Sequence, residues 1–272
     1  MGLRYTSLGS GSEGNALVVE ALDQKNQVCG RVLLDCGFGN KELSRRLLKR
    51  GLSPEQFDAL SVTHEHADHL GSAFGVAQRH QVCLMASHGT MEAAQEIVGH
   101  AKLDVVLQRR LCSHASFAVG ELEIHPFPVP HDAAEPTQFV FVHGDTRLGV
   151  LTDVGAPTPH IVHMLSACDG LVLEANHDPQ LLRDNVQYPA SLKRRIAGQH
   201  GHLSNEAAAQ ILASVDKRRL KRLHAAHLSQ QNNDVALVLE SFRQALAVGA
   251  SPELGVATQE QGFEWVSLSD QV

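Results

Sequence analysis

Short apolar runs alternate with amphipathic stretches along the first hundred residues. The β-branched and leucine-rich runs that predict strands are 16–20, 31–35, 59–63 and 82–85. The stretches with apolar residues at helical spacing are 41–50, which ends before Gly51, 75–80 and 90–98. Strands and helices in alternation are typical of an α/β protein.

The middle of the chain is rich in predicted strands, and the last third is rich in predicted helices. Strand patterns cover 116–128, 138–143, 148–152, 170–174 and 222–227. Helical patterns cover 161–167, 191–196, 204–215 and 233–247. Because no linker, low-complexity run or internal repeat divides the sequence, we expect residues 1–272 to form a single domain.

Composition narrows the class of protein only a little. The net charge of −7 argues weakly against a dedicated nucleic-acid or anionic-membrane binder, since a basic patch can sit on an acidic protein. The 5 cysteines form no C-x-x-C pair, which favours reduced thiols and a cytoplasmic protein. Neither a signal peptide nor an apolar run of membrane-spanning length is apparent, so we expect no membrane partner.

Residues capable of chemistry recur where predicted strands end. They are Asp35, His64, His131, Asp153, Glu174 and His227. In α/β folds, functional sites gather at the carboxyl ends of strands. The pattern therefore predicts one shared site built from distant parts of the chain.

A cluster of potential metal ligands follows the strand at 59–63. His64 and His66 can serve one divalent ion, and Asp68 with His69 can serve a second, if the segment forms an extended turn. Neither pair completes a coordination shell. The natural suppliers of further ligands are the strand-end residues His131, Asp153 and His227. The competing interpretation, a polar surface turn, fits a single histidine better than this cluster.

The run Thr63-His-x-His-x-Asp-His69 resembles the signature of the metallo-β-lactamase fold. Asp35, His131, Asp153 and His227 fit the other motifs of that fold, in the right order. The resemblance implies an αββα four-layer sandwich with a two-metal site. It leaves the substrate open, because the fold hosts lactamases, thioesterases, phosphodiesterases and nucleases.

A second resemblance covers residues 8 to 233 and is closer. The segments that carry it are 8–15, 34–37, 131–136, 152–155, 174–178, 188–195, 201–205 and 227–233. They are similar to the YycJ/WalJ-type family, whose members are described as metal-dependent 5′→3′ exonucleases acting on DNA. One departure is Ala190, which follows Pro189 where the family usually has an aromatic residue.

These resemblances imply a full set of metal ligands and catalytic residues. The first ion would be held by His64, His66 and His131, the second by Asp68, His69 and His227, with Asp153 bridging them. Asp35 would orient a ligand imidazole, and Asp68 could also hold the attacking water. His202 would protonate the leaving oxygen or grip the scissile phosphate. Zinc or manganese suits these ligands, and iron is possible.

Flanking polar residues are candidates for substrate binding. The Gly/Ser loop that contains Ser10, Ser12 and Asn15 could cradle a phosphate, or could simply form a tight hairpin. Asn176 and His177 could orient the substrate or a ligand, or form a polar turn. The basic run Lys193-Arg194-Arg195 could contact the phosphates of a strand.

The leading hypothesis is a phosphodiesterase that uses a metal-bridging hydroxide, and most specifically a 5′→3′ DNA exonuclease. One alternative is a small-molecule hydrolase, either a cyclic phosphodiesterase or a thioesterase of the glyoxalase II kind. Another is a non-catalytic regulatory or nucleic-acid-binding module that keeps its metal for structure. The sequence does not decide the native metal or the oligomeric state.

Overall fold

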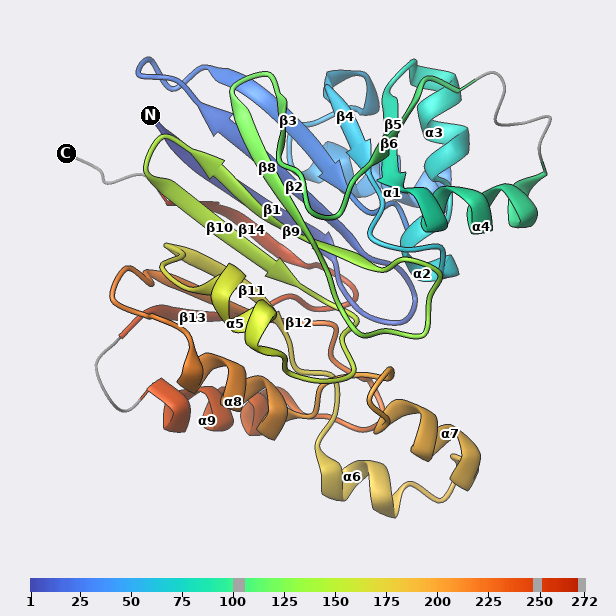
Figure 1. The fold of residues 1–272 in the computed structure, drawn as a ribbon, viewed down its shortest axis with the longest axis vertical. Coiled ribbons are helices and arrows are strands. Elements are labelled where there is room, and N and C mark those ends of the chain that lie inside the picture. Colours follow the sequence, from blue (N-terminus) through green and yellow to red (C-terminus); the bar gives the residue numbers. More distant parts are fainter. Residues whose placement is uncertain (100–105, 247–250, 269–272) are drawn as a thin grey trace.

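The computed structural model describes residues 1–99, 106–246 and 251–268, and within them two β-sheets pack face to face (Figure 1). The first sheet has the strand order β14-β1-β2-β3-β4-β5-β6. Its strands are β1 (Gly2–Gly9), β2 (Ala16–Leu22), β3 (Val28–Leu34), β4 (Ala59–Ser61), β5 (Cys83–Ser87), β6 (Gln108–Leu111) and β14 (Phe263–Ser267). The neighbours from β3 to β6 run parallel, and the other pairs are antiparallel.

The second sheet has the order β13-β12-β11-β10-β9-β8-β7. Its strands are β7 (Phe117–Val119), β8 (Leu122–Pro128), β9 (Thr137–His143), β10 (Thr146–Leu151), β11 (Gly170–Glu174), β12 (Arg222–Ala226) and β13 (Glu253–Val256). Here the neighbours from β10 to β13 run parallel. Each sheet therefore has a parallel half, whose strands end at a common edge.

Helices cover the outer face of each sheet, which gives the layers their αββα order (Figure 1). The helices over the first sheet are α1 (Asn40–Lys49), α3 (Ala73–His80) and α4 (His88–Val98). Those over the second sheet are α5 (Pro159–Leu165), α8 (Asn205–Ser214) and α9 (Val235–Leu246). Short turns of helix lie at η1 (Pro54–Gln56) and α2 (Ala67–Leu70).

The core between the sheets is mainly aliphatic, with a few large rings. Tyr5, Phe139 and Phe141 are fully buried there, beside Val32 and Leu148. Each buried side chain of this size contributes about 1.5–3 kcal/mol to stability. This packing holds the two sheets, and therefore their strand ends, in a fixed relation.

Helices α6 (Pro179–Asp184) and α7 (Ala190–Ile196) stand away from the sandwich, at the lower right of Figure 1. We call residues 179–196 the α6–α7 arm. Leu182 is the buried residue of α6, and α7 has none. Between the helices, Val186 is 95% exposed. The arm is therefore attached to the fold by a few specific contacts and not by a large apolar face.

The elements that the sequence predicted match the structure to within a few residues, with two errors, whereas strands β6, β13 and β14 and helix α6 were not predicted. The stretch 116–128 is not one strand, because Gly120 at φ 57° forms a turn that splits it into β7 and β8. The cluster after β4 is not wholly extended either, since Ala67–Leu70 forms helix α2. Residue 247, the predicted end of the last helix, lies outside the described residues. No helix in the described ranges combines the length and apolarity needed to cross a bilayer.

Candidate metal centre

The carboxyl ends of the parallel strands bring the predicted site residues together. Asp35 follows β3, Asp153 follows β10 by one residue, and His227 follows β12 directly. His64 lies just after β4, and His131 lies on the loop after β8. Because the two sheets pack face to face, ligands from both meet at one edge of the sandwich.

The backbone turns sharply at these strand ends. Asp35, Asp153 and His227 have φ angles of 62°, 55° and 55°, in the left-handed region. This conformation is uncommon for residues other than glycine and persists only where the surrounding structure enforces it. Left-handed backbone occurs at three strand ends of this one site. The fold therefore directs these side chains toward the site although the local backbone conformation is unfavourable.

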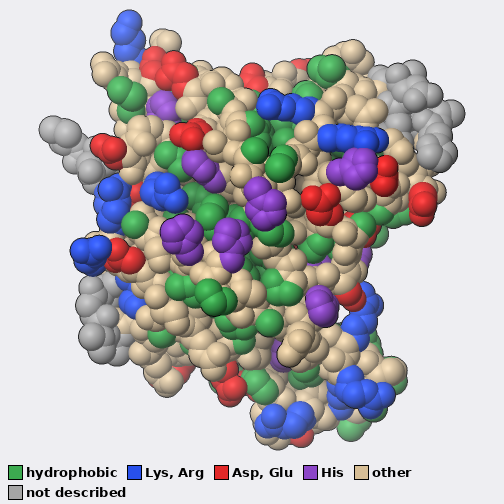
Figure 2. Space-filling model, viewed as in Figure 1, with side chains coloured by type: hydrophobic (Ala, Val, Ile, Leu, Met, Phe, Trp, Pro, Cys, Tyr) green, Lys and Arg blue, Asp and Glu red, His purple; other side chains and the backbone are tan. Residues whose placement is uncertain are grey.

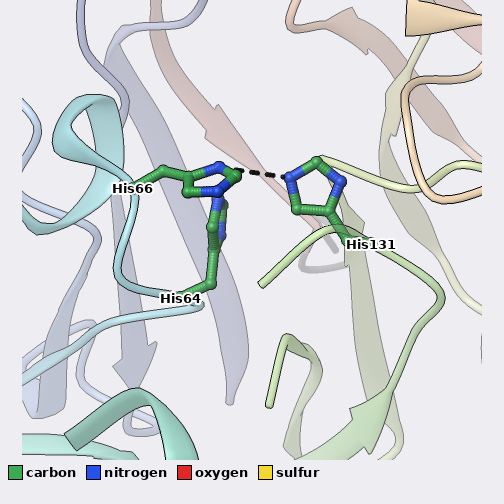
Figure 3. Close-up of side chains that lie close together, drawn as sticks. All are labelled: His64, His66 and His131. Atoms are coloured by element: carbon green, nitrogen blue, oxygen red, sulfur yellow. Dashed lines mark hydrogen bonds between the residues drawn. The ribbon is translucent and has the colours of Figure 1, made fainter. Parts of the chain in front are cut away.

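The first triad of candidate ligands consists of His64, His66 and His131. Their ring nitrogens lie within 4.8 Å of one another. Nε2 of His131 is 3.4 Å from Nδ1 of His66, and the rings face one another in Figure 3. This spacing suits a single ion between the rings.

Protein contacts select which nitrogen of His64 and His66 faces the centre. Nδ1 of His64 lies 3.0 Å from the Thr63 hydroxyl, and Nε2 of His66 lies 3.1 Å from the Asp132 carbonyl oxygen. The nitrogens left for an ion are Nε2 of His64 and Nδ1 of His66. Occupying the second ring nitrogen is how proteins fix the tautomer and orientation of a ligand histidine.

His131 is fixed in the same way from the second sheet. Its Nδ1 lies 3.0 Å from the carbonyl oxygen of Gly201, so Nε2 faces His66. Burial lowers the pKa of His131 to about 4. The ring is therefore neutral at pH 7, which is the form that binds a metal ion.

The second triad consists of Asp68, His69 and His227. Oδ2 of Asp68 lies 3.4 Å from Nε2 of His227 and 3.6 Å from Nε2 of His69. Nδ1 of His69 lies 2.8 Å from Oδ2 of Asp35, so Asp35 holds this imidazole from behind. The Thr63 backbone N–H in turn donates to Oδ1 of Asp35 at 2.8 Å.

Asp153 lies between the two triads. Its Oδ2 is 2.8 Å from Nε2 of His69, while its Oδ1 is 3.5 Å from Nε2 of His227 and 4.0 Å from Nε2 of His131. Burial raises the pKa of this carboxyl, but the charges of His227 and His69 more than offset it and hold the pKa well below its usual range. A buried, ionised carboxylate that lies within 4.0 Å of histidines of both triads can bridge two ions.

The residues present fit a pair of divalent ions. Among the described residues, Nε2 of His64 is buried without a hydrogen-bond partner. Leaving such a group unpaired costs about 1–3 kcal/mol, and a bound ion would remove that cost. Histidine nitrogens and carboxylate oxygens are also the donors that zinc and related ions prefer.

His202 lies beside the centre and is paired with Glu174. Its Nδ1 is 2.8 Å from Oε1 of Glu174, and its ring stacks on His227 with centroids 5.3 Å apart. Burial lowers the pKa of His202, but the hydrogen bond and charge of Glu174 outweigh it and raise the pKa to about 9. Glu174 was recognised only as a strand-end residue. The structure adds that it holds His202 and accepts a hydrogen bond from the Val154 N–H at 2.8 Å.

A cavity of about 360 Å³ opens onto the centre. Residues of both triads line it, as do the predicted candidates Ser12, Asn176 and His202. Arg195, the last residue of the predicted basic run, also lines it, as does Tyr188, which was not a predicted site residue. Both lie in the segment 188–195 that carried the family resemblance, but their approach to the centre depends on how the α6–α7 arm folds back.

Other residues expected at the substrate do not line this cavity. Ser10 and Asn15 are buried beneath the centre, where the Ser10 hydroxyl donates to Oδ1 of Asn15 at 3.0 Å and accepts from the His227 N–H at 3.0 Å. The Asn15 amide reaches the Asp68 carbonyl oxygen at 3.2 Å. Ser10 and Asn15 therefore position ligand residues in this structure, while Ser12 of the same loop lines the cavity.

The remaining candidates lie on either side of the cavity. His177 is 3% exposed and packs behind the centre. Lys193 donates to the carbonyl oxygen of Arg183 at 2.6 Å, and Arg194 is exposed on α7. Figure 2 shows Lys and Arg side chains gathered over α6 and α7. Neither Lys193 nor Arg194 lines the cavity.

Comparison with known proteins identifies the family. The model of the Beta-lactamase superfamily domain matches residues 30–225. Exodeoxyribonuclease WalJ of Streptococcus pneumoniae is 32% identical over 97% of this chain and 94% of its own length. Exodeoxyribonuclease YycJ of Bacillus anthracis is 32% identical over 90% of each chain. The chain therefore belongs to the metallo-β-lactamase superfamily and, within it, to the YycJ/WalJ-type family.

A solved structure shows the same fold. The metallo-β-lactamase fold protein YhfI from Bacillus subtilis has a TM-score of 0.70 and covers 98% of this chain and 100% of its own, at 14% identity. The predicted αββα sandwich and the predicted family are both confirmed.

Proposed function

We propose that this chain is a two-metal nuclease that removes nucleotides from the 5′ end of DNA. The observation that carries the proposal is the position of Asp153, buried between two ligand triads at the base of an open cavity. The two relatives named as exodeoxyribonucleases support a nuclease over a small-molecule hydrolase or a non-catalytic module.

The proposed site would hold its ions through residues of both sheets. His64, His66 and His131 would bind one ion, and Asp68, His69 and His227 the other, with Asp153 shared. Such ions lower the pKa of water and stabilise charge on a phosphoryl group. Zinc or manganese fits the donor set best, and iron is compatible with it. Because residues from both sheets meet at this one site, the site also supports our expectation that residues 1–272 form one domain.

The chain's own groups would then orient the substrate and move a proton. The Nδ1 of His202 is engaged by Glu174, so its Nε2 is the nitrogen left for the scissile phosphate or the leaving oxygen. Glu174 keeps the imidazole charged and oriented. The carboxylate of Asp68 lines the cavity beside the second triad, where it can also accept a hydrogen bond from the attacking water.

The cellular setting is part of the proposal. Cys36 and Cys168 are buried as free thiols, and Cys29, Cys83 and Cys112 are also unpaired. Unpaired thiols are usual in a reducing compartment, so we propose the cytoplasm.

A labelled-DNA assay tests the proposal. Purified protein with Mn²⁺ or Zn²⁺ should release mononucleotides first from a 5′-labelled strand, and EDTA should stop the release. RNA of the same sequence, a 3′-labelled strand and bis-p-nitrophenyl phosphate serve as comparisons. Cleavage of the small diester alone would favour the small-molecule hydrolase, and RNA cleavage alone would overturn DNA as the substrate. Metal binding with no hydrolysis of any of them would indicate the non-catalytic module.

A further inference from the structure

The carboxyl end of α7 is seated directly on the metal centre. A Cβ added at Gly201 would lie 2.1 Å from the Arg195 carbonyl oxygen and 2.2 Å from that of Ile196. A Cβ at Gly155 would lie 2.2 Å from the Gln199 carbonyl oxygen. Because these close approaches leave no space for a side chain, the segment that follows α7 packs tightly against both the last residues of α7 and the loop that carries Asp153. The α6–α7 arm is thus largely exposed, but its carboxyl end is held in place next to the metal centre.

This anchoring places Arg195 at the cavity. Arg195 is the only Lys or Arg among the described residues that line the cavity, and its side chain is 62% exposed. Its Nε lies 2.6 Å from Oδ2 of Asp132, whose Oδ1 is 3.5 Å from Nε2 of His131. The guanidinium is therefore held beside the first triad with donors left over, in the position where a phosphate would arrive.

The segment between α6 and α7 brings an aromatic ring to the same cavity. Tyr188 is half-buried and lines the cavity with Arg195. Apart from histidines, it is the one aromatic residue among the described residues of the lining. An aromatic face beside a cationic group is the combination with which proteins bind single-stranded nucleic acid, by stacking on the base and pairing with the phosphate.

We propose that Tyr188 and Arg195 form a binding site for one unpaired terminal nucleotide, an inference that rests on the proposed nuclease function. The base stacks on Tyr188, and the phosphate next to it pairs with Arg195, which directs the scissile bond toward Asp153. With one aromatic ring and one guanidinium in its lining, the cavity of about 360 Å³ offers a stacking face and a phosphate partner to a single nucleotide. The end of a duplex must therefore open before it is cut, and frayed or mismatched ends are cut faster.

An abasic end tests the role of Tyr188. Wild-type protein should bind a strand with an intact 5′-terminal nucleotide at a KM about tenfold lower than a strand whose terminal nucleotide lacks its base. Tyr188→Ala should lose this discrimination, with little change in kcat, and Tyr188→Phe should keep it. Equal KM values of wild type for the two strands, or undiminished discrimination by Tyr188→Ala, would overturn the stacking role.

Substitution of Arg195 tests the phosphate contact, with its ion-pair partner as the internal control. Arg195→Ala should raise the KM about tenfold or more, and Arg195→Lys should recover part of the loss. Asp132→Asn also breaks the ion pair but frees the guanidinium, so its KM should stay the same or fall. If Arg195 only positions Asp132, then Arg195→Ala and Asp132→Asn will lose activity to the same extent.

A matched control and a separate activity readout complete the experiment. Arg218→Ala removes an exposed arginine that is also paired with an aspartate at 2.6 Å, at the opposite end of β12, and should leave the KM unchanged. Bound metal should stay at the wild-type level in every variant. If wild-type protein hydrolyses neither DNA nor bis-p-nitrophenyl phosphate, the proposed function fails. If it degrades DNA while the variants retain the wild-type KM, only the nucleotide site fails.

Discussion

The two ligand triads differ by one carboxylate and are also supported differently. In the second triad, a buried carboxylate holds His69 at 2.8 Å, and the Ser10 hydroxyl holds the backbone of His227 at 3.0 Å. In the first triad, His131 and His66 rest on neutral carbonyl oxygens, at 3.0 and 3.1 Å. The second triad is thus fixed by charged and polar groups within the sandwich.

The first triad depends instead on the segment that follows α7. The carbonyl oxygen that orients His131 belongs to Gly201, and the Asp132 backbone N–H donates to the His200 carbonyl oxygen at 3.0 Å. The same segment carries Arg195 to the cavity. The comparison teaches that one half of the centre is held within the sandwich, whereas the other half is coupled to the element that we propose to bind substrate.

Removing Asp153 should abolish the difference between the triads, because both use it. Asp153→Ala should lose the full complement of metal and reduce nuclease activity at least about a thousandfold, equivalent to several kcal/mol of transition-state stabilisation. Metal content by mass spectrometry and the initial rate on 5′-labelled DNA measure the two effects. Full activity in this variant would contradict the two-metal assignment.

Removing His202 should slow the reaction without touching either triad. His202→Ala should retain both ions but lower kcat about a hundredfold, the usual contribution of a positioned proton donor. His125→Ala, on β8, provides a histidine control that should behave as wild type. Turnover equal to wild type in His202→Ala would exclude it from the mechanism.

Weakening Asp35 should sharpen the comparison by affecting mainly one triad. Asp35→Asn keeps the shape but removes the charge behind His69, so the Kd of one ion should rise about 10- to 100-fold. The Kd of the other ion should change less, because its ligand His64 meets Asp35 only through the Thr63 hydroxyl. Isothermal titration of metal into the apo protein resolves the two ions. Asp169→Asn changes a buried carboxylate paired with Arg219, distant from the centre, and should alter neither Kd. An equal loss at both sites would show that the triads are not supported independently.

The smallest effect is expected from the buried serine beneath the second triad. Ser10→Ala removes hydrogen bonds to Asn15 and to the His227 backbone, which should cost about 1 kcal/mol and lower the Tm by about 3 °C. Ser12→Ala changes an exposed neighbour and should not move the Tm. Thermal unfolding followed by circular dichroism compares the two. An unchanged Tm in Ser10→Ala would mean that water replaces the hydroxyl.

The sequence was most informative where a feature of the structure depends on a short, local run of residues. The spacing of His64, His66, Asp68 and His69 after a strand indicated fold and centre together, and strand ends located Asp153 and His227. Alternation alone could not reveal the turn at Gly120, because the polar and apolar positions continue through it. The helical turn at 67–70 was missed because its stability comes from contacts such as the Cys36 N–H with the His69 carbonyl oxygen at 2.8 Å.

Features that depend on long-range packing were beyond the sequence. Ser10 and Asn15 sit in a Gly/Ser loop that suggests phosphate binding, yet the fold buries them under the ligands. The sequence alone could not show which residue of the basic run reaches the cavity. The contacts of Gly155 and Gly201 show that the carboxyl end of α7, where Arg195 lies, is the end that meets the centre.

The left-handed backbone at Asp35, Asp153 and His227 has a consequence for how such a protein can change over time. Each residue holds a conformation that glycine adopts with less strain, at a cost on the order of 1 kcal/mol. Glycine at any of the three would relieve this strain, but it would also remove the side chain from the centre. Backbone strain and ligand geometry therefore favour different residues at these positions.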